Sequence, residues 1–192
     1  MKRFRTIKPE IRVLGVDDGS FSPHHGFASV VGVIFRGGYW LDGVLSTKVK
    51  VDGFDATDRI ASMIVDSPHH RQVRVILLDG VTFGGFNVVD IKKLYALTNL
   101  PVIVVTRDKP NFKEIHAAVK NLPNSAKRWK AVQNAGQVFE VQTRNRDEKV
   151  YMEVCGASES DARKILELTS TRSSVPEALR VAHLIASGTS QA

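Results

Sequence analysis

The sequence predicts a single α/β domain built on a mixed sheet, and two features carry this prediction. First, two short apolar segments, residues 13–16 and 75–78, run into Asp17-Asp18-Gly19 and Asp79-Gly80. Runs this short and this rich in Val, Ile and Leu are typical of strands buried on both faces. Second, strand-like segments come first along the chain, and helical segments then alternate with apolar strands. That order predicts helices packed on a sheet with a parallel portion.

The N-terminal part of the chain predicts a three-stranded antiparallel meander. Residues 11–17 form its first strand, residues 27–35 the second and residues 39–51 the third. Arg36-Gly37-Gly38 makes the hairpin turn between the second and third strands. The connection between the first two strands, residues 18–25, consists of turn-forming residues.

Helices and strands alternate in the middle of the chain. A helix capped by Asp55 or Thr57 ends before Pro68, because proline disfavours helical backbone in the residue that precedes it. Strand 73–79, helix 87–98 and strand 101–106 follow, and then helical segments over 111–120 and 125–134.

The C-terminal part predicts a strand pair, residues 136–143 and 149–154, which turns on residues 144–147. Ser158 caps an amphipathic helix, and a last helix runs from Pro176 to Gly188. Three antiparallel strands followed by helix, strand, helix and strand is the order of the ribonuclease H-like fold. With no repeat or linker in the sequence, we expect residues 1–192 to form one such domain.

The composition favours an intracellular protein with a polyanionic partner. Lys and Arg outnumber Asp and Glu by 27 to 20, a balance that suits nucleic acid. Cys155 is the only cysteine, so no intrachain disulfide forms, and a reducing compartment is expected. Cys155 lies in an apolar strand pattern and is expected to be a small buried side chain. Because no apolar run is long enough to cross a bilayer, we expect a cytoplasmic protein without membrane contact.

Asp17 and Asp79 are the first candidates for a functional site. In the ribonuclease H-like order the first and fourth strands are parallel neighbours, which brings both side chains to one edge of the sheet, where α/β proteins bind ligands. Two carboxylates this close repel each other unless a cation lies between them, and carboxylate oxygen suits Mg²⁺ or Mn²⁺. Asp58, in the first turn of the intervening helix, is our candidate for a third ligand, and Asp18 is the alternative. Weaker candidates, in the first turns of the last two helices, are Asp161 and Glu177. Each acid taken singly is also explained as a turn or helix-start residue.

Further candidates would contact the nucleic acid. Arg107 directly follows strand 101–106, with Lys109 close by, and is placed to bind a phosphate oxygen. The glycine-rich segment Phe83-Gly84-Gly85-Phe86-Asn87 would contact a base or sugar. A basic run, in which Trp129 could stack on a base, would track the backbone through Lys127, Arg128 and Lys130. Ordinary surface or helix-face residues are the alternative explanation for these cations.

The histidines carry less signal. His24-His25 and His69-His70 are pairs in predicted loops and are interpreted as solvated side chains. His183 lies on an apolar helix face and is interpreted as a core histidine whose hydrogen bonds are satisfied.

Several motifs together resemble an archaeal family of long-uncharacterised proteins, sometimes called endonuclease dU. They are Val-Asp17-Asp18-Gly19, Val51-Asp-Gly-Phe-Asp-Ala-Thr-Asp58, Leu78-Asp79-Gly80-Val-Thr-Phe-Gly-Gly-Phe-Asn87-Val-Val-Asp90, Leu100-Pro-Val-Ile-Val-Val105 and Leu179-Arg-Val-Ala-His-Leu-Ile-Ala-Ser-Gly188. That family in turn resembles endonuclease V, which has a ribonuclease H-like fold and cuts DNA or RNA near deaminated bases, using Mg²⁺.

The resemblance to endonuclease V assigns roles residue by residue. It makes Asp17 and Asp79 metal ligands, places Asp58 where endonuclease V has a glutamate, and places Arg107 near its lysine. The aromatic-proline wedge with which endonuclease V probes the lesion has no counterpart before Asp58.

Taken together, the sequence predicts a metal-dependent endonuclease for damaged or deaminated nucleic acid of the uracil or inosine type. Asp17, Asp58 and Asp79 would hold one or two Mg²⁺ (or Mn²⁺), Arg107 would assist catalysis, and DNA is expected as the partner rather than RNA. The alternative is a binding module for nucleic acid or protein on the same fold, without catalysis. A third hypothesis is a phosphohydrolase that acts on a nucleotide.

Overall fold

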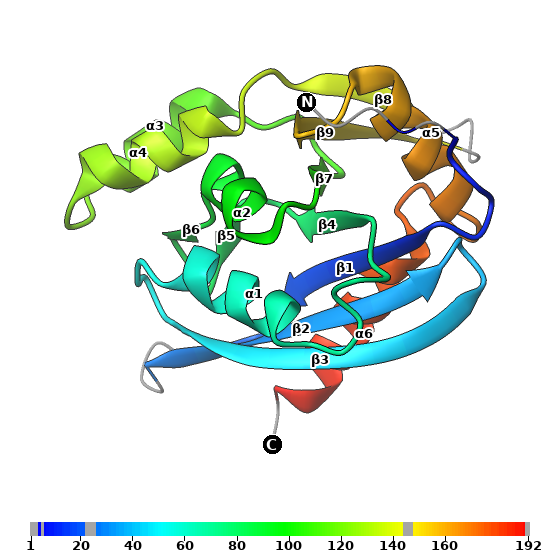
Figure 1. The fold of residues 1–192 in the computed structure, drawn as a ribbon. Coiled ribbons are helices and arrows are strands. Elements are labelled where there is room, and N and C mark those ends of the chain that lie inside the picture. Colours follow the sequence, from blue (N-terminus) through cyan, green and yellow to red (C-terminus); the bar gives the residue numbers. More distant parts are fainter. Residues whose placement is uncertain (1–3, 5, 22–25, 144–147, 191–192) are drawn as a thin grey trace.

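A computed structural model describes residues 4, 6–21, 26–143 and 148–190, and it shows a mixed sheet with helices on both faces (Figure 1). The seven strands of the sheet are ordered β3-β2-β1-β4-β7-β9-β8. The α/β prediction is therefore confirmed. The predicted turn at residues 144–147 and the pair His24-His25 lie outside the described residues.

The first three strands form the predicted antiparallel meander. They are β1 (Arg12–Asp18), β2 (Phe27–Arg36) and β3 (Trp40–Lys50). β1 lies between β2 and β4, and its residues Val13, Leu14 and Val16 are fully buried.

The centre of the sheet is parallel. β1 pairs with β4 (Val75–Asp79), and β4 pairs with β7 (Val102–Thr106). In register, Val16 lies beside Leu78, so the residues that follow them, Asp17 and Asp79, come to the same edge. Two antiparallel strands complete the sheet, β9 (Lys149–Cys155) next to β7 and β8 (Phe139–Gln142) beyond it.

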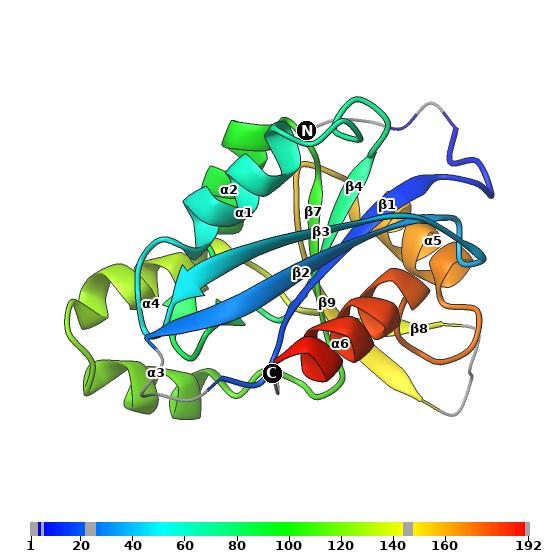
Figure 2. The same cartoon turned by 90° about the horizontal axis from the view of Figure 1, so that it is seen from below.

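Helices cover both faces of the sheet (Figures 1 and 2). α1 (Ala56–Val65) and α2 (Ile91–Thr98) pack on one face. α5 (Glu159–Thr169) and α6 (Glu177–Thr189) pack on the other. α3 (Phe112–Lys120) and α4 (Ser125–Asn134) contact each other, and α4 also contacts α2.

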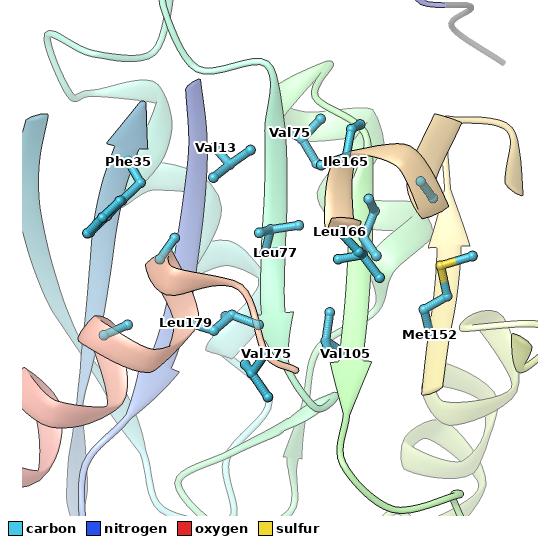
Figure 3. Packing of buried hydrophobic residues seen from close by; sticks show 14 of the residues in the cluster. Val13, Phe35, Val75, Leu77, Val105, Met152, Ile165, Leu166, Val175 and Leu179 are labelled. Atoms are coloured by element: carbon cyan, nitrogen blue, oxygen red, sulfur yellow. The ribbon is translucent and has the colours of Figure 1, made fainter. Parts of the chain in front are cut away.

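Alternate strand residues build two cores, one on each face. Val75, Leu77, Val105 and Met152 pack against α5 and α6 in the core that Figure 3 shows. The intervening residues of the same strands pack against α1 and α2. Because both faces of β1, β4 and β7 are covered, their sequences show continuous apolar runs rather than alternation.

Residues 87–90 differ from the predicted helix 87–98. Asn87 and Val88 form the strand β6, which pairs with β5 (Thr82–Phe83) in a short hairpin. The helix α2 begins only after Asp90. The Asp90 carboxylate accepts from the backbone N–H groups of Lys92 and Lys93, at 3.0 and 3.1 Å, which caps the helix there. Asn87 is fully buried and belongs to a strand, and its side chain forms hydrogen bonds at the start of α1.

Asn87 also replaces the cap predicted for α1. Asp55 occupies the N-cap position, but its side chain makes no capping hydrogen bond. The Asn87 side-chain oxygen accepts from the N–H of Ala56 at 3.0 Å, and its nitrogen donates to the Asp55 carboxylate at 2.7 Å. A residue 31 positions away thus caps the helix, and local sequence does not reveal such a partner.

In the described part of the chain, no helix has both the length and the apolar character that a membrane span requires. Cys155 is half-buried at the end of β9, and burial raises the pKa of its thiol. A thiol with a raised pKa is a poor nucleophile, in keeping with the packing role expected for it.

Candidate metal centre and its surroundings

Asp17, Asp79 and His183 converge at the edge of the sheet where β1 and β4 end. One potential ligand atom from each lies within 4.8 Å of those of the other two. The two carboxylates come from parallel neighbouring strands, and the imidazole comes from α6 on the opposite side of β1 from α1. The predicted convergence of Asp17 and Asp79 is therefore present in the structure.

Glycines on β1 bring α6 close enough to deliver His183. A Cβ on Gly15 would lie 2.3 Å from the backbone carbon of Ala178, and a Cβ on Gly19 would lie 2.5 Å from the carbonyl oxygen of Ala186. These two contacts bracket Asp17 along β1 and His183 along α6. The helix therefore lies directly on the strand, and the imidazole reaches the carboxylate.

Hydrogen bonds fix the Asp17 carboxylate. One oxygen accepts from the N–H of Asp18 at 2.8 Å, and the other lies 2.8 Å from Nδ1 of His183. An ionised carboxylate only accepts, so Nδ1 donates this hydrogen bond, and Nε2 is the ring nitrogen that Asp17 does not engage. The Asp17 side chain is only 7% exposed, whereas that of His183 is 57% exposed.

Burial and mutual repulsion perturb the acids. Burial, followed by the charge of Asp79, raises the pKa of Asp17 to about 6. Burial also raises the pKa of Asp79, against the opposing effect of the Arg107 and His183 charges. Groups whose charged forms are this disfavoured gain from a cation, since it offsets both the repulsion and the lost hydration.

The interpretation of His183 as a satisfied core histidine is wrong. Its ring is exposed and its hydrogen-bond partner is a buried carboxylate 166 positions away in the sequence. The apolar residues around it in the sequence do face the core, but His183 lies at the boundary of that face, next to exposed Leu184. A pattern of polar and apolar residues does not show which strand residue lies opposite such a position.

Asp58 is not brought to this cluster, so the predicted set of three aspartates is corrected. Its side chain is 54% exposed and pairs with Nζ of Lys93 on α2 at 2.7 Å. The group that the structure assembles from described residues has His183 as its third member. The reason is geometric: the first turn of α1 packs against α2, and Asp58 points along that contact.

Asp18, the alternative third acid, lies next to the cluster. Burial raises its pKa, and the charge of Asp79 adds to that effect. One of its oxygens accepts from the N–H of Gly84 at 2.7 Å, which ties the β5–β6 hairpin to the end of β1. Its carboxylate thus has a structural partner in addition to its proximity to Asp79.

Arg107 is exposed just beyond β7, and its charge acts on Asp79 as described above. The structure thus places a cation beside the acid cluster, as predicted.

The weaker candidates for a metal ligand, Asp161 and Glu177, lie at helix starts. Asp161 donates its N–H to the Ser158 hydroxyl at 3.1 Å, and the buried Glu177 accepts from Arg180 at 2.7 Å.

The glycine-rich segment is largely structural. Phe83 and Asn87 are fully buried, so the prediction that their side chains contact nucleic acid is wrong. The N–H of Gly84 is taken by Asp18 and that of Phe86 by Asp52. Gly84 and Gly85 have φ of 54° and 81°, the left-handed region that glycine adopts without strain. Partial exposure leaves Gly85 and Phe86 as candidates for contact.

The prediction that Arg128 contacts the nucleic-acid backbone is also wrong, because only 2% of this residue is exposed. Its guanidinium donates to the carbonyl oxygens of Pro123, Gly53, Asp52 and Phe86 and stacks on the ring of Phe54 at 4.1 Å. It therefore joins α4 to the α1 entry loop and the hairpin and is not free to bind phosphate.

The other residues of the basic run and the loop histidines remain at the surface. Lys127 and Lys130 are exposed and stay candidates for backbone contact. Trp129 packs edge-on against His116, with centroids 4.5 Å apart. His69 and His70 are partly buried, and a ring nitrogen of His70 lies 3.1 Å from the carbonyl oxygen of Thr98.

Comparison with known proteins places the chain in a family. The sequence profile described as Endonuclease dU matches residues 9–190. The chain belongs to the endonuclease dU family. A UPF0215 protein of Methanopyrus kandleri is 51% identical over 186 residues, which cover 97% of this chain and 94% of that protein.

Solved structures show the same fold as this family member. A protein of unknown function from Archaeoglobus fulgidus is similar with a TM-score of 0.84 and 39% identity, covering 93% of this chain and 97% of that one. Endonuclease V of Ciona intestinalis, in complex with DNA that contains an inosine, is similar with a TM-score of 0.57 and 17% identity, covering 90% and 82%. At that identity the likeness shows the fold, and it confirms the predicted relation to the endonuclease V architecture.

Proposed function

We propose that this protein is a metal-dependent endonuclease that acts on damaged or deaminated nucleic acid. The observation that carries the proposal is the convergence of Asp17, Asp79 and His183 at the carboxyl edge of two parallel strands. Membership of the endonuclease dU family and the endonuclease V fold support a nuclease.

The residues present suit a divalent cation. Two carboxylates with raised pKa values and an imidazole offer oxygen and nitrogen donors within 4.8 Å of one another. Carboxylates favour Mg²⁺, and the nitrogen makes Mn²⁺ an equally good guest. When bound, such a cation lowers the pKa of a coordinated water and offsets charge on phosphoryl oxygens.

The remaining roles belong to this chain's own groups. Asp17 holds the His183 ring by its Nδ1, so the other ring nitrogen, Nε2, would be the one that binds the cation. Arg107, beside Asp79, binds a non-bridging phosphate oxygen and offsets charge that develops in the transition state.

The substrate class rests on the relatives and on charge. The Ciona intestinalis enzyme is seen with DNA that contains an inosine, and the chain carries a formal charge of +7. We therefore propose a nucleic acid with a deaminated base, with DNA preferred to RNA.

Cleavage of end-labelled strands tests the proposal. Strands with one uracil, one inosine or no lesion are incubated with and without Mg²⁺, and cuts near the lesion only with the metal are expected. Asp79→Asn should abolish cutting while the circular dichroism spectrum stays that of the wild type. Asp58→Asn is the matched control, because its exposed ion pair lies outside the cluster, and it should cut at nearly the wild-type rate. Full activity in the Asp79→Asn protein would refute the assignment.

Metal binding separates this proposal from a binding module without catalysis. Titration of Mn²⁺, followed by calorimetry or electron paramagnetic resonance, should show binding that Asp17→Asn and His183→Ala both weaken. Absence of binding at millimolar Mn²⁺ would favour the binding module. A panel of small phosphate esters tests for the phosphohydrolase.

A further inference from the structure

A cavity of about 280 Å³ begins directly beside the acid cluster. It is lined by Gly80, Val81 and Thr82, which follow Asp79, and by Thr106, which ends β7 next to Arg107. Its apolar wall comes from Phe86 of the hairpin, Phe112 and Ile115 of α3, and Val132 of α4. Pockets for small ligands start at about 300 Å³, so this volume suits one small planar molecule.

The carboxyl group of Glu153 lines this cavity without a partner. Glu153 lies on β9 beside Val104 of β7 and is only 4% exposed. Within the described part of the chain, no hydrogen bond or ion pair involves its carboxyl group. With so little of the residue exposed, the carboxyl group keeps only a small part of its hydration, and no protein partner replaces the rest. Such a group at the wall of a cavity points to a ligand that completes its hydrogen bonds.

The acid form of Glu153 both donates and accepts a hydrogen bond. Burial raises the pKa of Glu153 to about 7, so the acid form is well populated near neutral pH. The other ionisable side chains that line the cavity, Asp108 and Lys109, are exposed. A carboxylic acid pairs through two parallel hydrogen bonds with a ring that presents an N–H next to a carbonyl oxygen. Uracil and hypoxanthine both present that cyclic-amide edge.

We propose that this cavity receives a base turned out of the strand and that Glu153 pairs with its cyclic-amide edge, so that Glu153 is a specificity residue. The proposal rests on the function proposed above and adds the group that recognises the substrate. Phe86 and Phe112 offer ring faces for stacking on the base. The position of the cavity supports the proposal. The residues that follow Asp79 form one of its walls, so a phosphate next to the inserted base would reach the acids.

Binding to strands that differ only in one base tests the proposal without cleavage. Fluorescence anisotropy in EDTA compares a single strand that carries uracil, hypoxanthine or a tetrahydrofuran abasic site at one position. The wild type should bind the uracil or hypoxanthine strand about tenfold more tightly than the abasic strand, the discrimination typical of one bidentate pair to a base. Glu153→Leu should remove that preference. Glu153→Gln keeps one donor and one acceptor and should retain it.

A second readout observes Glu153 itself. With ¹³C-labelled glutamate, the carboxyl signal that Glu153→Gln removes identifies the residue, and it should shift on addition of the uracil strand and not of the abasic strand. A wild type without base preference, or a Glu153→Leu protein that keeps it, would overturn the proposal. If Glu153→Leu cuts at the wild-type rate, the proposed nuclease function is supported and the proposed base-binding cavity is refuted. Base preference lost in Glu153→Leu, in a protein that cuts no strand, supports the pocket and removes the nuclease.

Discussion

Replacement of Glu153 by glutamine should stabilise the protein at alkaline pH and leave it nearly unchanged at acid pH. Burial raises the pKa of this carboxyl from 4.5 to about 7 in the folded state. The folded chain thus holds a proton that the unfolded chain releases as pH rises above 4.5, and the free energy of unfolding falls until pH passes the folded pKa. A difference of about 2.5 pKa units, at about 1.36 kcal/mol each, amounts to about 3 kcal/mol. Glutamine does not titrate, so the variant avoids this loss.

Urea unfolding, followed by circular dichroism at pH 5, 6.5 and 8, measures the effect. The gap between the Glu153→Gln variant and the wild type should widen by about 2–3 kcal/mol from the lowest to the highest pH, because the other titrations are common to both proteins and cancel. Glu167→Gln, at an exposed position of α5, is the control, and its pH profile should follow that of the wild type. A gap that stays constant with pH would show that Glu153 is solvated in the folded state, and the reasoning would fail.

Three further predictions follow from the packing around the site. Gly15→Ala forces a Cβ into the backbone of α6, so it should lower the free energy of unfolding by about 2–3 kcal/mol and weaken Mn²⁺ binding. The control is Gly188→Ala on α6, where a Cβ meets open space, and it should have neither effect. Arg128→Ala leaves buried carbonyl groups unpaired and should destabilise by about 3 kcal/mol in urea unfolding, whereas Lys130→Ala should leave stability within about 0.5 kcal/mol and weaken only DNA binding. Arg107→Ala should lower the cleavage rate about a hundredfold while Mn²⁺ binding is kept. Normal Mn²⁺ binding in Gly15→Ala, wild-type stability in Arg128→Ala or an unchanged rate in Arg107→Ala would contradict the corresponding assignment.

The strands and their order could be predicted because their signals are local. A strand covered on both faces must be apolar throughout, so β1, β4 and β7 are visible in the sequence as short continuous runs. The convergence of Asp17 and Asp79 then follows from strand order alone. Where local signals were weak the prediction missed: the two-residue strands of the hairpin are too short for a pattern, and their conformation depends on Asn87, Asp18 and Asp52.

The roles of individual charged residues were harder to predict, because charge does not show burial. Arg128 belongs to a basic run in the sequence, yet its guanidinium is enclosed by carbonyl groups from three segments. Asp58 has the residue type and spacing expected of a ligand, yet the orientation of α1 pairs it with Lys93. In each case the deciding partner is distant in the sequence and leaves no periodic signal near the residue.

By itself, the sequence determined that two aspartates end buried strands, because the apolar runs that precede them are typical of strands covered on both faces, and the order of the elements then predicted that these strands are neighbours. Only the tertiary structure decided which group completes the cluster. α6 docks against Gly15 and Gly19, and that contact, made across more than 160 residues, sets His183 against Asp17. The tertiary structure also decided that Glu153 is buried beside a cavity. The burial of a strand carboxylate depends on the helices that cover it and not on the strand's own residues.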